Sequence, residues 1–246
     1  MRKVVVTGHS QGLGLALAQC LLDQEVEVLA ISRSSNAELG QRYPEQLRQV
    51  TIDLSRLDEL TDWLASDVLA RFAVGASQLA LINNAGQVQP IAALGEQDNA
   101  DIAMAVNLNV SAPLMLANEF ERVTRAVADR RVLHVSSGAA RSAYAGWSVY
   151  CATKAALDHH ARCVALDAPA GLKIASLAPG VLDTAMQARI RASTDEQFPL
   201  RARFEAMKRD GELGQAAVVA TKLVAYLFAA TFGDDQATEI NKVSTA

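Results

Sequence analysis

Tyr150 and Lys154 are the two side chains whose types and spacing most clearly allow chemistry. They stand four positions apart in a segment with a helical pattern, so both project from the same face of a helix. A free tyrosine ionises near pH ~10, and a nearby cation favours the phenolate. The pair is therefore suited to give or take a proton. A solvated helix surface can show the same spacing, so the pair alone does not establish a site.

The segment that follows the first apolar run has the composition of a phosphate-binding loop. Glycines permit a tight turn and a close approach of the backbone, and a helix N-terminus offers N–H groups and a positive dipole end to a pyrophosphate. The glycine spacing is a relative of the common dinucleotide fingerprint. We expect this loop to bind a dinucleotide through Gly8, Ser10, Gln11, Gly12, Leu13 and Gly14.

Arg33 indicates which dinucleotide is preferred. An acidic residue at the end of the second strand would bind the ribose 2′-OH of NAD, whereas a basic residue accommodates the 2′-phosphate of NADP. The chain has Arg33 at this place and no carboxylate before Glu38, which favours NADP(H). Asp53, after the third strand, could accept a hydrogen bond from the adenine amino group. It could equally be an ordinary turn residue.

Length and composition narrow the class of protein. Of the 246 residues, 50% are hydrophobic and 20% are charged, which suffices for a two-sided α/β core. The net charge of −4 gives no basic surface for nucleic acid. No uninterrupted apolar run approaches the ~18 residues of a membrane span, and no leader pattern follows Arg2 and Lys3. The three cysteines lack a paired spacing, so we expect reduced thiols in a cytoplasmic protein.

Short β-branched runs alternate with longer helical patterns along the whole chain. This alternation predicts a doubly wound (Rossmann) α/β fold, with a seven-stranded parallel sheet and helices on both faces. No linker or repeat divides it, so residues 1–246 are expected to form one NAD(P)-binding domain. Strands are predicted at 3–7, 26–31, 49–52, 78–82, 131–136, 172–177 and 237–241, and helices at 12–24, 55–72, 97–128, 148–167 and 214–229.

A charged, mixed segment at about residues 185–213 interrupts this alternation, with Pro199 inside it. Two interpretations remain open for this segment. It could be a solvated pair of helices, or it could be a mobile lid over a substrate, as long insertions in compact domains often are.

Several groups of residues, taken together and in order, resemble the single-domain short-chain dehydrogenases/reductases. They are Thr7-Gly8, Gly12 and Gly14, then Asn83-Asn84-Ala85-Gly86, Asn107, Ser137, Tyr150 and Lys154, then Pro179-Gly180 and Thr184. A narrower resemblance, to the bacterial benzil reductases, rests on Ser136–Ala139, on Tyr144–Cys151 and on Ala178–Ala188. Those enzymes are relatives of sepiapterin reductase that reduce one carbonyl of a 1,2-diketone with NADPH.

The resemblance implies a role for each catalytic candidate. Tyr150 would donate the proton to the developing alkoxide, and Lys154 would bind the nicotinamide ribose and stabilise the phenolate. Ser137 would hydrogen-bond the substrate oxygen. Ser136 competes for that role, but neighbouring strand residues point to opposite sides and the family's spacing to the tyrosine favours Ser137. Asn107 would belong to a water relay linked to Lys154, unless it is only a solvent-facing residue.

The resemblance also implies further cofactor contacts. Asn84, Ala85 and Gly86 would brace the loop beside the cofactor. Pro179 and Gly180 follow the sixth strand, at the edge where ligands bind in such sheets. The Val181 backbone and the Thr184 hydroxyl would hold the carboxamide, and Tyr150 and Lys154 would contact the cofactor as well.

The remaining histidines and aromatic residues give weaker indications of function. His159 and His160 are adjacent and cannot chelate as an i,i+4 pair could, so we expect no metal site. His9, inside the glycine loop, could make a weak phosphate contact. Tyr144 and Trp147 could be core residues or aromatic walls for an aryl ketone.

These observations favour an NADPH-dependent carbonyl reductase that acts on a small diketone or aromatic ketone. A 3-oxoacyl reductase or a sugar or alcohol dehydrogenase is the alternative, although the tail from residue 237 lacks the glycine pair usual in 3-oxoacyl reductases. A non-catalytic NADP-sensing protein is a third reading, but such proteins tend to lose the tyrosine or the lysine. By resemblance we expect a homodimer, with a tetramer as the alternative, and no nucleic-acid or membrane partner.

Overall fold

Seven parallel strands form one sheet in the computed structural model, which describes residues 1–244. The strand order is β3-β2-β1-β4-β5-β6-β7, so the predicted doubly wound α/β fold is confirmed. The strands are β1 (Arg2–Thr7), β2 (Glu27–Ser32), β3 (Leu47–Thr51), β4 (Gln78–Asn83), β5 (Asp129–Val135), β6 (Leu172–Ala178) and β7 (Ala237–Glu239).

The central strands are apolar on both faces because helices cover the sheet on both sides. Val4, Val5 and Val6 of β1 are all fully buried, although successive side chains point to opposite faces. β1 pairs in register with both β2 and β4. The chain therefore reverses its direction of winding beside β1, and such a switch point opens a crevice at the carboxyl ends of the strands.

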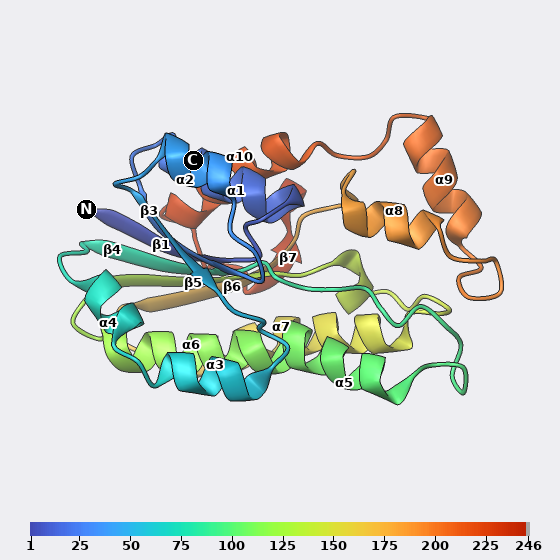
Figure 1. The fold of residues 1–246 in the computed structure, drawn as a ribbon, viewed down its shortest axis with the longest axis horizontal. Helices are drawn as coiled ribbons and strands as arrows, with labels where there is room; N and C mark the ends of the chain where they lie inside the picture. The colour runs from blue at the N-terminus through green and yellow to red at the C-terminus, as the bar shows by residue number, and fades with distance from the viewer. Residues whose placement is uncertain (245–246) are drawn as a thin grey trace.

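Two helical layers enclose the sheet (Figure 1). Helices α1 (Gly12–Leu22) and α10 (Ala216–Phe228) pack together on one face, with the short α2 (Ala37–Arg42) beside them. The other face carries α3 (Leu57–Leu64), α4 (Val68–Ala73), α5 (Asn99–Val106), α6 (Ala112–Thr124) and α7 (Ser148–Asp167). A separate apolar cluster fills each side of the sheet.

The helix predicted at 55–72 is two helices, α3 and α4. The helix predicted at 97–128 begins at Asn99 and ends at Thr124, and a π-helical turn, Asn107–Ser111, lies inside it. This 99–124 stretch is long and apolar enough to cross a membrane by length and composition alone. It packs along the sheet, where Leu116 and Phe120 are buried, as a core helix of a globular protein does.

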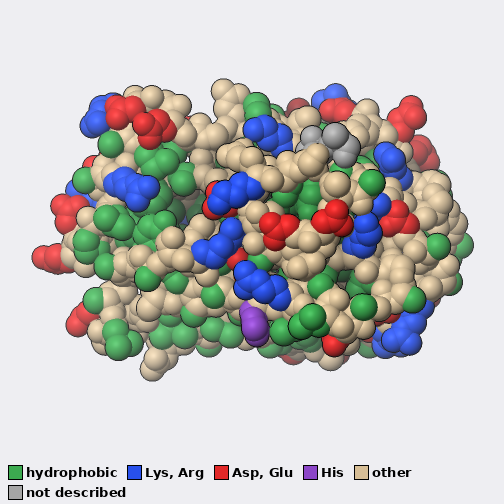
Figure 2. Space-filling view, turned by 180° about the vertical axis from the view of Figure 1, so that it is seen from behind, with side chains coloured by type: hydrophobic (Ala, Val, Ile, Leu, Met, Phe, Trp, Pro, Cys, Tyr) green, Lys and Arg blue, Asp and Glu red, His purple; other side chains and the backbone are tan. Residues whose placement is uncertain are grey.

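Residues 185–213, hereafter the lid segment, contain two helices, α8 (Ala185–Arg191) and α9 (Arg201–Arg209). They project beyond one end of the sheet in Figure 1. Hydrophobic side chains gather at the corresponding end of the space-filling view in Figure 2, while basic and acidic side chains intermingle over its middle. A third apolar cluster joins the lid segment to the start of α7 through Trp147, Phe198 and Phe204.

Candidate active site

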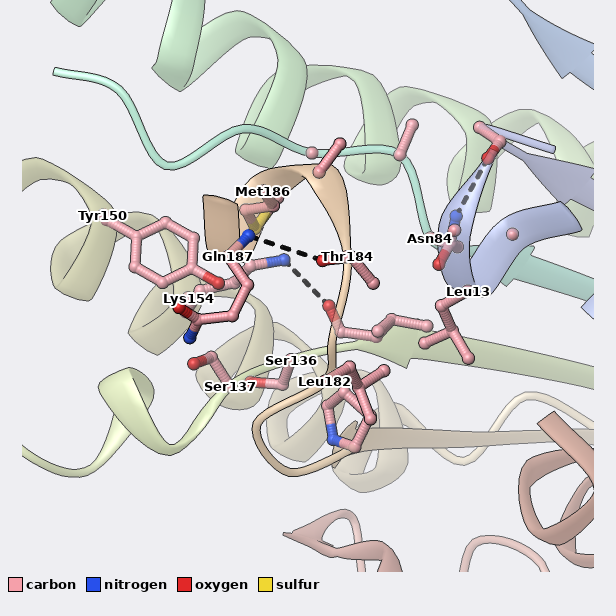
Figure 3. A pocket seen from close by; sticks show the side chains of 18 of the residues that line it. Leu13, Asn84, Ser136, Ser137, Tyr150, Lys154, Leu182, Thr184, Met186 and Gln187 are labelled. Carbon is pink, nitrogen blue, oxygen red and sulfur yellow. Dashed lines mark hydrogen bonds between the residues drawn. The ribbon is translucent and has the colours of Figure 1, made fainter. Parts of the chain in front are cut away.

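A cavity of about 740 Å³ opens at the carboxyl edge of the sheet. Its lining comes from the loop after β1, the end of β5, helix α7, the loop after β6 and the lid segment. Figure 3 shows Tyr150, Lys154 and Ser137 together on one side of this cavity, with Leu13 and Asn84 on the other. The fold thus brings together the two groups of residues that the sequence suggested, the proton-transfer set and the glycine loop.

Tyr150 lies in the first turn of α7 with only 8% of its surface exposed. Its ring meets the Trp147 ring edge-on, with centroids 5.5 Å apart. Burial raises the pKa of Tyr150, and a hydrogen bond with Ser137 partly opposes that rise. The sequence-based expectation of a lowered pKa is therefore wrong for this structure, because the lost hydration of the phenolate is the dominant effect. The phenol is held in its protonated form, as a proton donor requires.

Lys154 lies one helical turn beyond Tyr150 and is equally enclosed. Its ammonium donates a hydrogen bond to the Val135 carbonyl at 2.8 Å and lies 5.9 Å from the centre of the Tyr150 ring. Burial lowers the pKa of Lys154 to about 8, while the Asp158 carboxylate acts in the opposite direction. The cation is thus fixed to the end of β5, beneath the cavity.

The two neighbouring serines after β5 have different surroundings. Ser136 is buried and donates to the Asp158 carboxylate at 2.6 Å. Ser137 accepts a hydrogen bond from the Ala139 N–H at 3.2 Å and is also hydrogen-bonded to Tyr150. Figure 3 shows the Ser137 side chain on the same side of the cavity as the Tyr150 hydroxyl. This geometry favours Ser137 over Ser136 as the group that could bind a substrate oxygen.

Asn107 requires a correction. Its amide donates to the Ser55 carbonyl at 3.1 Å and does not line the cavity. Asn109 is the buried asparagine, and it bonds to both backbone groups of Gln87 and to Thr153. A Cβ built on Gly86 would lie 3.2 Å from Asn109 Oδ1 and 3.6 Å from Lys154 Nζ, so these two polar groups flank one glycine.

The π-helical turn explains this difference between the two asparagines. A π turn inserts an extra residue and rotates the side chains that follow it relative to a regular α-helix. Sequence spacing that assumes regular helix geometry therefore selects the wrong asparagine. The signal that could have located the right one is the unusual pair of helix-interior asparagines two positions apart.

The glycine loop is tightly closed against the end of β4. A Cβ on Gly14 would lie 2.0 Å from the Gly8 carbonyl oxygen, so only glycine fits at position 14. Asn84 donates to the Thr7 carbonyl at 2.9 Å, and its backbone N–H and that of Ala85 both donate to the Thr7 hydroxyl. These bonds place Asn84, Ala85 and Gly86 along the cavity, where they were predicted.

The residues present fit a dinucleotide. Gln11 is the N-cap of α1 without a side-chain hydrogen bond, so the first N–H groups of this helix are open to an anion. Gly12 has a positive φ of 59°, and a Cβ there would face Thr184 at 3.6 Å across the cavity. A side chain at position 12 would occupy the space between the loop and the residues after β6. Ser10, Gln11, Gly12 and Leu13 all line the cavity.

The far end of the cavity contains a free cation. Arg33 is exposed, lines the cavity and forms no ion pair among residues 1–244. Asp53 does not line the cavity, although its neighbours Ile52 and Leu54 do, and one of its carboxylate oxygens accepts from both the N–H and the hydroxyl of Ser55. The structure therefore favours the turn role for Asp53 over the predicted adenine contact.

His9 also differs from expectation. It is fully buried and bonds to Gln49 at 2.8 Å and to Ser32 at 3.1 Å, so it points into the protein and not toward a phosphate. Burial lowers the pKa of His9. Through these two hydrogen bonds the imidazole connects the glycine loop to β2 and β3.

The loop after β6 reaches the cavity as predicted. Pro179, Gly180, Val181 and Thr184 all line it, and Gly180 has a positive φ of 86°. Thr184 is the N-cap of α8, and its hydroxyl oxygen accepts from the Gln187 N–H at 3.5 Å. The Thr184 hydroxyl donates to no residue in the described range 1–244, so its hydrogen is available to a ligand. These residues could hold the carboxamide end of a dinucleotide.

An aromatic wall closes the outer side of the cavity. The Trp147 ring stacks on Phe198 with centroids 4.5 Å apart and also contacts Tyr144 and Phe204. Tyr144, Trp147 and Phe204 line the cavity together with Met186 and Ile190 of α8. Trp147 is thus both a core residue and a wall. The sequence did not single out Phe198, Phe204 or Gln187, since no local pattern shows which residues of the lid segment face inward.

His134 lies on β5, deep in the protein. It contacts Asn83 at 3.2 Å and His160 at 3.1 Å. Burial, together with the nearby His160 and Lys154, lowers the pKa of His134 to about 3. Within the described part of the chain, no group of three or more histidine, cysteine or acidic side chains is arranged to hold a metal ion.

Comparison with known proteins agrees with this geometry. Residues 2–195 match the family model of the short chain dehydrogenases. The chain is 36% identical to a benzil reductase ((S)-benzoin forming) of Bacillus cereus, over 87% of this chain and 88% of the relative. It is 30% identical to the sepiapterin reductase of Bos taurus, over 91% and 88% of the two chains. The crystal structure of a short-chain dehydrogenase/reductase from Burkholderia vietnamiensis is 43% identical, with a TM-score of 0.72 and 98% of each chain covered.

Proposed function

Because the chain belongs to the short chain dehydrogenase family and is an oxidoreductase of C=O and CH–OH groups, we propose a narrower activity for it. The protein is proposed to be an NADPH-dependent reductase of small diketones and aromatic ketones. The similarity to the benzil reductase of Bacillus cereus supports a 1,2-diketone as the substrate.

One observation carries the proposal. The Tyr150 and Ser137 hydroxyls and the aromatic wall share one cavity with the glycine loop. A carbonyl oxygen bound by the two hydroxyls would have its substituents against Trp147, Phe204 and Ile190, which form an apolar surface suited to aryl groups. A strongly polar sugar would leave its hydroxyls unpaired against this wall.

The residues of the chain have distinct roles in the proposed reaction. Tyr150 donates its proton to the substrate oxygen as negative charge develops there. Ser137 donates a second hydrogen bond to the same oxygen and is placed before the reaction begins. The Lys154 cation stabilises the phenolate that remains after the transfer. A nicotinamide cofactor, bound along the glycine loop and the loop after β6, supplies the hydride.

Arg33 supports the preference for NADPH. It is the exposed guanidinium at the β2 end of the cavity, with no acidic partner among the described residues. Guanidinium groups bind phosphates through paired, charge-assisted hydrogen bonds. An unpaired Arg33 therefore suits the 2′-phosphate of NADPH.

The test is consumption of NADPH with a panel of carbonyl compounds: benzil, 1-phenyl-1,2-propanedione, a pterin diketone, a quinone and a 3-oxoacyl thioester. We expect the two aryl diketones to give the highest kcat/KM. Tyr150→Phe removes the hydroxyl and keeps the ring, so it should lower kcat by a factor of about 10² or more and change NADPH binding much less. Highest activity on the 3-oxoacyl thioester, or unchanged turnover in Tyr150→Phe, would contradict the proposal.

A further inference from the structure

Gln187 is a buried amide of the lid segment that faces the cavity. Only 3% of its surface is exposed, and it lines the cavity from the first turns of α8. In Figure 3 its side chain extends toward the side of the cavity where the Tyr150 and Ser137 hydroxyls lie. Its own backbone N–H is bonded to the Thr184 hydroxyl, so the start of α8 is fixed at this point.

Arg191 determines which end of the Gln187 amide faces the cavity. The Arg191 guanidinium donates to Gln187 Oε1 at 3.2 Å and also lies 3.9 Å from the Asp183 carboxylate. A guanidinium has no acceptor, so it can pair only with the oxygen of the amide. The amide orientation is therefore fixed by the chemistry of its partner.

The Nε2 group of Gln187 consequently projects two N–H donors that bond to no described residue. The cavity walls around it are apolar, formed by Met186 and Ile190 of the same helix and by Trp147 and Phe204. Gln187 Nε2 is reachable from the cavity and is not one of the fully enclosed polar atoms that lack a partner, so water can bond to it while the cavity is empty. A ligand that displaces this water without supplying an acceptor would leave the donor unpaired at a cost in free energy.

We propose that Gln187 is a specificity residue whose amide N–H groups bind a second substrate oxygen, on the carbon next to the reacting carbonyl. This inference rests on the proposed function, in which Tyr150 and Ser137 take the first oxygen. The substrate class is then narrowed to vicinal dicarbonyl compounds with an apolar substituent. A simple ketone of the same shape leaves the Gln187 donors unpaired, and sites built to bond a substrate group discriminate against analogues that lack it.

The experiment compares benzil with deoxybenzoin, which has the same two phenyl rings and lacks one oxygen. Wild-type kcat/KM is measured for both; a ketone that is not reduced is measured as a competitive inhibitor of benzil reduction. Gln187→Met keeps the volume and removes the amide. We expect it to lower kcat/KM for benzil by about tenfold and to change the value for deoxybenzoin by less than about twofold.

Three further variants isolate the amide donor. Gln187→Glu keeps an oxygen for Arg191 and removes the donor. It should therefore lose the preference for benzil over deoxybenzoin, as Gln187→Met does. Arg191→Met frees the amide to rotate and should weaken the preference for benzil without abolishing it. Gln197→Met makes the same change at an exposed lid glutamine that does not line the cavity, and should leave the preference unchanged.

Binding gives a readout that is independent of turnover. The affinities of benzil and deoxybenzoin for the protein saturated with NADP⁺ are measured by calorimetry, and only that of benzil should fall in Gln187→Met. An equal loss for both ketones, or none, would overturn the role of Gln187. If the wild type is active on the carbonyl panel but its preference for benzil over deoxybenzoin does not depend on Gln187, only this inference fails. If the wild type reduces neither benzil nor 1-phenyl-1,2-propanedione, the proposed function fails as well.

Discussion

Ser136 donates a hydrogen bond to the buried Asp158 carboxylate at 2.6 Å, and this contact turns it away from its neighbour Ser137. Asp158 also accepts from Ser176 of β6 and from Arg141. The carboxylate therefore joins the ends of β5 and β6 to helix α7, one turn beyond Lys154. Two adjacent serines thus have separable tasks, one in holding the fold together and one at the cavity.

Alanine substitutions should separate these two tasks. Ser137→Ala removes a donor from the position of the developing negative charge, so we expect kcat to fall by a factor of about 10² with little change in stability. Ser136→Ala leaves a buried carboxylate with one bond fewer and should cost about 2 kcal/mol of unfolding free energy. Urea unfolding and steady-state kinetics on both variants provide the check. A larger loss of kcat in Ser136→Ala than in Ser137→Ala would show that Ser136, and not Ser137, contacts the substrate.

Arg33 should control the choice between the two cofactors. Replacing it by alanine removes a charge-assisted hydrogen bond, so KM for NADPH should rise by about ten- to a hundredfold, while KM for NADH changes little. Arg162→Ala, at an exposed position of α7 that does not line the cavity, is the matched control. Equal effects of Arg33→Ala on the two cofactors would mean that Arg33 does not contact the 2′-phosphate.

The buried Lys154 should make stability depend on pH in the alkaline range. Its folded pKa of about 8 lies below the ordinary value of 10.5, so between these limits the unfolded chain binds the proton more strongly. Stability then rises with pH across this window, and the full penalty of about 3 kcal/mol is present below it. Lys154→Met should remove this slope in urea titrations, whereas the exposed Lys222→Met should retain it. An unchanged slope in Lys154→Met would show that the ammonium is better solvated than its burial indicates.

His134 should contribute to unfolding in acid. Its folded pKa of about 3 lies below the ordinary 6.5, so the unfolded chain takes up a proton that the folded chain refuses. Stability is therefore lost as pH falls from about 6.5 toward about 3. His134→Asn should flatten this part of the stability curve, even though it gives up the contact with His160. The exposed His159→Asn is the control, and the same acid slope in wild type and His134→Asn would exclude His134 as the cause.

The sheet could be predicted from the sequence because its signal is local. Continuous β-branched runs such as Val4-Val5-Val6 mark strands buried on both faces, and alternation with helices dictates a parallel order. The carboxyl edge of such a sheet then collects the residues that end the strands. For this reason the glycine loop, Asn84 and Ser137 lie along one cavity, as expected.

The residues that the sequence located wrongly or not at all depend on three-dimensional geometry that residue spacing does not encode. Asn109, and not the predicted Asn107, is the buried asparagine because a π turn lies between regular helices. His9 turns inward to bond with Gln49, forty residues along the chain, and the sequence gives no sign of that partner. Gln187 faces the cavity only because Thr184 fixes the start of α8 and Arg191 orients its amide. Each of these placements is set by a tertiary contact.

The stacking of Trp147 on Phe198 also has a thermal consequence. Both rings are almost fully buried, and Phe204 packs against them, so any opening of the lid segment would expose aromatic surface to water. Exposure of apolar surface carries a positive heat-capacity change. The equilibrium between closed and open forms would then give a curved van't Hoff plot, and the closed form would lose part of its advantage on cooling. If residues 185–213 open in this way, access to the cavity would depend on temperature through the hydration of three aromatic rings.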